Sequence, residues 1–138
     1  MPKLSYIYSQ TSVILTVNGY PDVSSGHDNQ TIGIISSWKL ELVGSPELEG
    51  KKEHLSSLMN TVYPYVRYRL SGLRRTFGED KSPVQIKSSN YGHEIILTSS
   101  QPNIQPLTLK LDDAELSDLV CCLDLLRGDP RVSVTWFV

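Results

Sequence analysis

Apolar and polar residues alternate along the first part of the chain, as expected for strands that cover a core on one face. The segment SYIYSQTSVILTVNG (residues 5–19) predicts two short strands with a break near Gln10, and Asn18-Gly19 predicts a turn. TIGIISSWKLELVG (residues 31–44) predicts one long strand or two, because Ser36-Ser37 can be a bulge or a break. Residues 45–50 are predicted to be a connector.

The clearest periodic signal in the chain is helical, from about Lys51 to Gly72. Its apolar stripe follows the i, i+3, i+4, i+7 spacing and consists of Leu55, Leu58, Met59, Val62, Val66, Leu70 and Leu73. Pro64 removes one backbone donor inside this helix and predicts a kink near Asn60. The polar residues 76–83 are the best candidate for a linker between two halves.

The second half repeats this order of elements. VQIKSS and HEIILTSS predict two strands around a turn at residues 90–92, and QPLTLKL predicts a third. A second helix is predicted to begin after Asp112, with Glu115 completing a capping box, and to end at Gly128. RVSVTWFV (residues 131–138) predicts a closing strand.

These elements predict an α+β fold of two antiparallel strand-meander-plus-helix units, in the order βββα-βββαβ. Most connections between strands are too short for parallel crossovers, which favours antiparallel sheets. Both helices are expected to pack on sheet. We expect a single domain over residues 1–138, with repeat-like halves at about 1–75 and 82–138.

Composition favours a soluble protein in a reducing compartment. The net charge of −2 argues against bulk electrostatic binding to nucleic acid, which usually goes with a basic domain. The two cysteines, Cys121 and Cys122, are adjacent and cannot bridge each other with ordinary geometry. No secretory signal and no membrane span is evident. The expected location is cytoplasmic.

The sequence proposes no catalytic residue, no metal ligand and no cofactor site. His27, His54 and His93 each lack a second ligand at metal-binding spacing. His27 is predicted to lie in a solvated loop and His54 to be exposed. The acids of DDAELSD (residues 112–118) are explained by capping and by the helix dipole.

The best functional lead is VYPYVRYRLSGLRR (residues 62–75), with three tyrosines, four arginines and one proline. On a helix, Tyr63, Arg67 and Arg74 share one flank, while Tyr68 and Arg75 point away from the core. Tyr65 is placed with Arg69 on the other flank, at the border of the buried stripe. Leu125 lies opposite the stripe of the second helix. The candidate interaction surface is therefore Tyr63, Arg67, Tyr68, Arg74, Arg75 and Leu125.

A structural explanation of this stretch competes with a dedicated site. Tyrosines at the border keep their hydroxyls in water, and arginine stems cover apolar surface. The stretch also has an internal partner, because residues 112–129 hold six acids against one base, Arg127. Its basic end is either paired with the acidic second helix, within one chain or across a dimer, or free to meet another molecule.

Two resemblances bear on function. One pattern consists of SYIYSQTSVILTVNG, SSWKLELVG with a long helix, VQIKSS, HEIILTSS and PLTLKLDDAELSDLVCCLDLL. It resembles a cyanobacterial domain family of unknown function, with LSDLV at residues 116–120 its most specific part. That family implies no activity and no site residues. The order of elements resembles the Whirly and Pur-alpha type of single-stranded nucleic-acid-binding fold, although the lysine-glycine-lysine signature of Whirly proteins is absent.

We therefore expect a non-enzymatic interaction or assembly protein of a cyanobacterial cytoplasm, serving a photosynthetic or other multi-subunit complex. A protein partner or a homo-oligomer is expected. The alternative is a single-stranded DNA- or RNA-binding protein of Whirly-like fold, and an enzyme ranks third.

Overall fold

The computed structural model describes residues 3–22, 29–45, 47–70, 83–90, 92–98, 105–134 and 136, apart from the side chains of residues 68–70. Its first half consists of β1 (Leu4–Ser9), β2 (Val13–Tyr20), β3 (Ile34–Leu42), β4 (Leu48–Gly50) and helix α1 (Lys52–Leu70). Its second half consists of β5 (Val84–Ser89), β6 (Gly92–Leu97), β7 (Leu107–Leu111) and helix α2 (Asp113–Arg127).

The first four strands form one antiparallel sheet in the order β1-β2-β3-β4. The strands predicted on either side of Gln10 are confirmed, and residues 34–42 form one strand. The turn predicted at Asn18-Gly19 is wrong, because β2 continues to Tyr20 and only its register with β3 shifts there. A Cβ atom on Gly19 would overlap the Ile34 carbonyl oxygen, so this glycine permits close approach of two strands.

The predicted connector at residues 45–50 contains a strand. Leu48–Gly50 pairs antiparallel with β3, and Leu48 is buried. Gly50 lies against the Trp38 indole, whose Nε1–H donates to the Lys51 carbonyl at 2.8 Å. Three residues are too few to produce a recognisable alternation, which is why the pattern did not predict β4.

The second sheet is antiparallel in the order β5-β6-β7, as the sequence predicts. The predicted closing strand is wrong over its described residues, 131–134 and 136. Val132 makes only an isolated parallel bridge to Ile32, flanked by hydrogen bonds from Ile32 N–H to Arg131 and from Ser133 N–H to Ile32. Ile32 itself lies outside any strand, so the ladder cannot extend.

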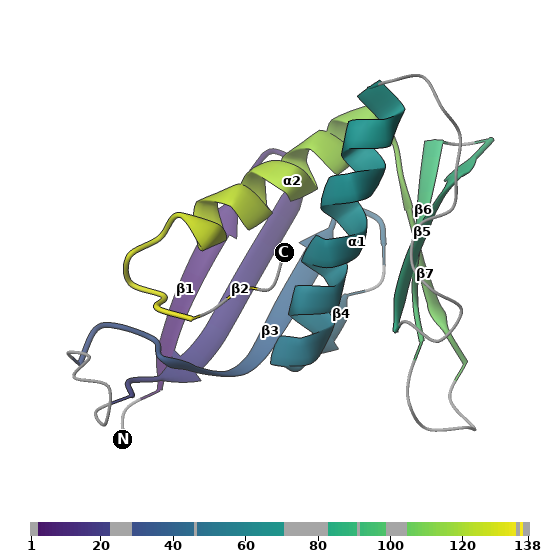
Figure 1. The fold of residues 1–138 in the computed structure, drawn as a ribbon. Coiled ribbons are helices and arrows are strands. Elements are labelled where there is room, and N and C mark those ends of the chain that lie inside the picture. Colours follow the sequence, from purple (N-terminus) through teal and green to yellow (C-terminus); the bar gives the residue numbers. More distant parts are fainter. Residues whose placement is uncertain are drawn as a thin grey trace.

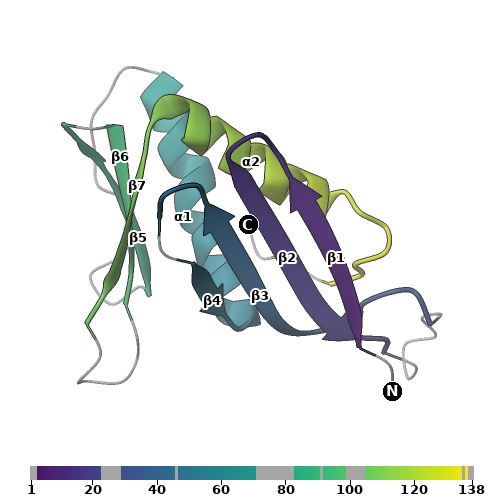
Figure 2. The same cartoon turned by 180° about the vertical axis from the view of Figure 1, so that it is seen from behind.

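Both helices cover one face of the four-stranded sheet, and the three-stranded sheet packs against another side of α1 (Figure 1). Helix α1 therefore lies between two sheets, while α2 crosses β1 and β2. Seen from behind, the opposite face of the four-stranded sheet is covered by neither of the two described helices (Figure 2). The predicted α+β class, with antiparallel sheets and helices packed on them, is confirmed, with the described elements in the order ββββα-βββα.

The second sheet widens the buried surface of α1 beyond the predicted stripe. The buried residues of the described part of this helix are Leu55, Leu58, Met59, Thr61, Val62 and Tyr65. Tyr65 was predicted at the border with a wet hydroxyl but is only 1% exposed, because β5 packs over that flank. Val66, predicted in the stripe, is only half-buried.

Helix α2 follows the sequence prediction closely. The Asp112 carboxylate accepts from Glu115 N–H at 2.8 Å, and Glu115 accepts from Asp112 N–H at 3.0 Å. These bonds form the predicted capping box. The helix ends at Gly128, whose N–H donates to the Asp124 carbonyl. Its buried residues are Leu116, Leu119, Cys122, Leu123 and Leu126.

Candidate interaction surface

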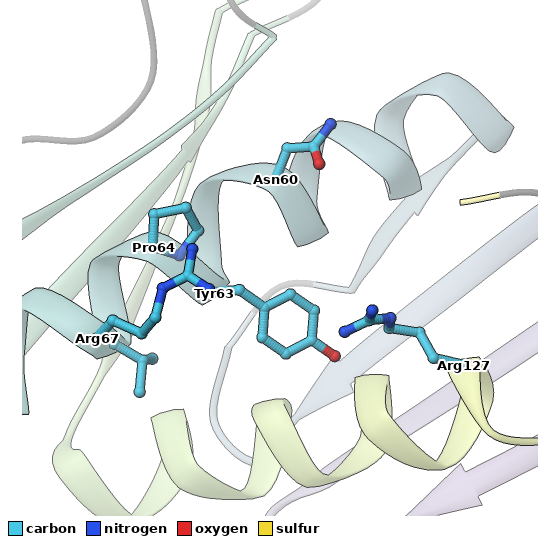
Figure 3. A pocket seen from close by; sticks show the side chains of 6 residues that line it. Asn60, Tyr63, Pro64, Arg67 and Arg127 are labelled. Carbon is cyan, nitrogen blue, oxygen red and sulfur yellow. The ribbon is translucent and has the colours of Figure 1, made fainter. Parts of the chain in front are cut away.

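An open pocket of about 350 Å³ lies between the two helices. Helix α1 contributes most of the lining, and α2 contributes its last residue. The lining residues are Asn60, Tyr63, Pro64, Val66, Arg67 and Arg127. Tyr63 extends from α1 toward α2, with Arg67 and Arg127 on either side of it (Figure 3). The pocket therefore combines an aromatic ring, apolar surface and two guanidinium groups.

Tyr63 is held in place from α2. Its hydroxyl donates to the Asp124 carboxylate at 2.8 Å, and the Arg127 guanidinium carbon lies 4.8 Å from the centre of its ring. Burial, followed by the hydrogen bond to Asp124, raises the pKa of Tyr63 to about 12. The phenol is therefore neutral at physiological pH, and its ring forms a fixed wall of the pocket.

Arg67 supplies the accessible cation of this pocket. Its side chain is exposed, and it forms no hydrogen bond or ion pair with any residue in the described ranges. Arg127 is also exposed but is partly engaged by the Tyr63 ring. An incoming carboxylate or other acceptor would thus meet the Arg67 guanidinium, which no described residue engages, and the Arg127 guanidinium, which an aromatic face already orients.

The structure brings together only part of the predicted surface. Tyr63 and Arg67 line the pocket, and Leu125 is 49% exposed on α2, as expected. The side chain of Tyr68, and all of Arg74 and Arg75, lie outside the described residues. Tyr63 of this flank is bonded to Asp124 of the acidic helix within one chain, whereas Arg67 pairs with no described residue, so the predicted pairing of the basic end stays a prediction. The sequence shows Arg127 only as the lone base of residues 112–129, because its place beside Tyr63 depends on how the helices cross.

A second polar group, which the sequence did not predict, lies between α1, the three-stranded sheet and α2. The His93 Nδ1 atom is 2.5 Å from the Tyr65 hydroxyl, and its Nε2 is 2.6 Å from the Asp113 carboxylate. The Tyr65 hydroxyl also lies 3.1 Å from the Ser88 hydroxyl. These side chains form a continuous hydrogen-bonded chain from the interior to the surface at Asp113.

The hydrogen-bonded side chains around His93 fit a structural role better than a catalytic one. Tyr65 and His93 are each only 1% exposed, so a substrate could not reach either group. Their rings pack edge to face, with centres 5.3 Å apart. The hydrogen bonds satisfy buried polar atoms and join β6 to both helices. The apolar alternation of β6 places His93 inward, and this was the one signal that could have indicated its burial.

One comparison with known proteins gave a match. A family model described as "Domain of unknown function (DUF4335)" matches residues 6–138. This chain belongs to that family. No curated protein and no solved structure matches it.

The DUF4335 domain has a third polar cluster where the chain leaves α2. Asp129 accepts from the Tyr8 hydroxyl at 2.8 Å and from Arg131 Nη2 at 2.8 Å. The Arg131 guanidinium carbon lies 4.1 Å from the centre of the Tyr6 ring. Hydrogen bonds from Arg131 are the main cause that lowers the pKa of Asp129 to about 2. This cluster ties the segment after α2 to β1.

The remaining titratable residues of the DUF4335 domain offer no metal centre in the part that the structure describes. No group of three His, Cys, Asp or Glu residues there is placed to hold an ion. His27 lies outside the described residues. His54 is half-buried instead of exposed as predicted, and its Nδ1 has no hydrogen-bond partner among them. No described helix is long and apolar enough to cross a membrane.

Proposed function

We propose that this DUF4335 domain is a non-enzymatic interaction or assembly protein that binds a protein partner through the pocket between α1 and α2. The observation that carries the proposal is the fixed Tyr63 ring with Arg67 exposed beside it and Arg127 opposite. Tyrosine and arginine are enriched in protein–protein interfaces. Because the Tyr63 ring is already ordered, binding a partner against it costs little conformational entropy.

The proposal extends to the cytoplasm of a cyanobacterium, where the protein would serve a photosynthetic or other multi-subunit complex. The support for the organism is the sequence resemblance described above. The support for the compartment is that Cys121 and Cys122 are both free thiols, which suits a reducing environment.

The buried position of His93 supports the non-enzymatic part of the proposal. The His93–Asp113 pair has the donor and acceptor groups of an acid–base site, but its Tyr65 partner is enclosed. The Tyr63 phenol in the open pocket is a poor base or nucleophile, because its pKa is raised to about 12 and its proton is held by Asp124.

Single-stranded nucleic acid is the alternative ligand, and the open face of the four-stranded sheet is where a Whirly-like protein could bind it. Such binding relies on aromatic side chains that stack on bases. The outward positions of β1, β2 and β3 carry one aromatic residue, the half-buried Tyr20 at the end of β2. The others are serine, isoleucine, threonine, asparagine, lysine and glutamate, at positions 5, 7, 9, 14, 16, 18, 34, 37, 39 and 41. The helix-side pocket is therefore the better-supported site.

Affinity capture from a native cyanobacterial lysate tests the proposal with three baits: the unchanged protein, Arg67→Glu and Lys110→Glu. The control changes charge equally on β7 of the three-stranded sheet, away from the pocket. We expect one stoichiometric partner, lost with Arg67→Glu and kept with Lys110→Glu. Measured on the purified pair, Arg67→Glu should weaken binding at least about tenfold.

Two results would overturn the proposal. The first is a protein that captures no stoichiometric partner, or captures one equally well with Arg67→Glu. The second is micromolar, salt-dependent binding of a labelled single-stranded oligonucleotide, which would favour the alternative.

A further inference from the structure

The two sheets of the described residues have four edge strands, and among these strands β1 is the one that lacks charge, proline and short length. Exposed edges pair with other strands unless charge, proline or short length prevents it. Strand β4 has three residues and includes Glu49, β5 includes Lys87, and β7 includes Lys110. Strand β1, LSYIYS, has six residues with no charge and no proline. It lies at the margin of the four-stranded sheet (Figure 2).

The backbone register shows which β1 groups point outward. In the β1–β2 hairpin, Gln10 N–H donates to the Val13 carbonyl at 2.8 Å. Hydrogen-bonded pairs alternate with non-bonded pairs along an antiparallel ladder. The backbone N–H and C=O groups of Ser5, Ile7 and Ser9 are therefore directed away from β2, toward the free edge.

The strand is held firmly on its helix-facing side. The Tyr8 hydroxyl is bonded to Asp129, and the Tyr6 ring lies under Arg131. On the opposite, open face, Ile7 is 65% exposed and Ile14 of β2 is 40% exposed. The β1 edge is thus held in a fixed conformation, with the exposed apolar side chain of Ile7 at its centre.

We propose that β1 pairs antiparallel with β1 of a second copy of this chain, centred on Ile7. This register places Ile7 opposite its own copy and Ser5 opposite Ser9, so that outward-directed backbone groups meet. It also keeps the buried and open faces of the two sheets aligned. The two four-stranded sheets become one continuous sheet, and two Ile7 side chains bury each other on the open face.

A second copy suits this edge better than a different strand for two reasons. An uncharged strand can lie against itself without placing like charges opposite each other. A two-fold pair uses the same edge in both molecules, so one contact covers both unprotected edges and the assembly closes.

Sedimentation equilibrium from micromolar to sub-millimolar concentration tests the pairing. We expect a reversible monomer–dimer equilibrium that Ile7→Lys weakens at least about tenfold, because a lysine at the centre of the edge opposes its copy. The control is Ile34→Lys, the same substitution at a residue 51% exposed on β3 of the same sheet. It should leave the equilibrium unchanged. A protein that stays monomeric, or an equal effect of both variants, overturns the proposal.

A cross-link tests the register even if a lysine disturbs folding. In a Cys121→Ser background, Ile7→Cys should form a covalent dimer under mild oxidation, since the two positions face each other across the axis. Ile34→Cys in the same background should not. Efficient cross-linking at residue 34, or none at residue 7 in a protein with unchanged circular dichroism, overturns the proposed contact.

Discussion

Tyr63 of α1 donates its hydroxyl hydrogen to Asp124 of α2 at 2.8 Å, and this bond joins two helices through residues 61 positions apart. The bond orients the Tyr63 ring between Arg67 and Arg127 (Figure 3). The same contact therefore contributes to the packing of the helices and to the shape of the pocket.

Replacing Tyr63 with phenylalanine should lower the free energy of unfolding by about 1 kcal/mol, because the hydrogen bond to a carboxylate is lost while the ring remains. Urea denaturation followed by circular dichroism measures this. Tyr20→Phe is the control, since the Tyr20 hydroxyl has no hydrogen bond to a described residue. A Tyr63→Phe protein as stable as the control would show that the bond is not maintained in solution.

Substitution of the two hydrogen-bond partners of His93, Tyr65 and Asp113, should change the stability of the protein by different amounts. Tyr65→Phe should cost about 1–3 kcal/mol of stability, because it leaves the Nδ1 atom of His93 without a partner in the core. Asp113→Asn should cost less, because the side chain of residue 113 is 88% exposed and water can replace its interaction. Denaturant midpoints of the two variants decide this, and equal losses would contradict it.

Asp129 should contribute a pH-dependent part of the stability at low pH. Its pKa is lowered from the ordinary 3.8 to about 2 in the folded protein, chiefly by Arg131, so proton binding favours the unfolded state. This stabilisation is complete above about pH 4 and is lost as the pH falls toward about 2.

Melting temperatures between neutral pH and pH 2 test this contribution. The unchanged protein should lose stability more steeply below pH 4 than Asp129→Asn, which lacks the titrating group. Glu49→Gln, at an exposed position of β4, should keep the original slope. If Asp129→Asn also keeps it, the interaction with Arg131 does not stabilise the folded state.

The adjacent cysteines should differ sharply in reactivity. Cys121 is exposed, whereas burial raises the pKa of the Cys122 thiol to about 11. Because the thiolate is the reactive species, we expect one thiol of the native protein to react promptly with a disulfide reagent. The second should react on the order of 100-fold more slowly until denaturant is added. Cys121→Ser should abolish the prompt phase, and prompt reaction of both thiols in the native state would contradict the burial.

Local patterns in the sequence predicted those helices and strands whose bounds and core face are set by their own residues. Helix α2 carries its start signal in Asp112 and Glu115, its stop signal in Gly128 and its core face in evenly spaced leucines. The strands on either side of Gln10, and the antiparallel strands β5 and β6, were predicted for the same reason. Of the candidate surface, Tyr63 and Arg67 were correctly placed on one flank of α1, because helical geometry alone fixes that relationship.

Contacts between elements required the tertiary structure. The sequence could not show that a second sheet packs on α1, so it placed Tyr65 at a wet border and left His93 without a role. It also could not show that Arg127 reaches Tyr63, or that residues 131–134 meet only Ile32. Hydrogen bonding within a helix or hairpin depends on neighbouring residues, whereas burial from two sides and pairing across helices depend on the path of the whole chain.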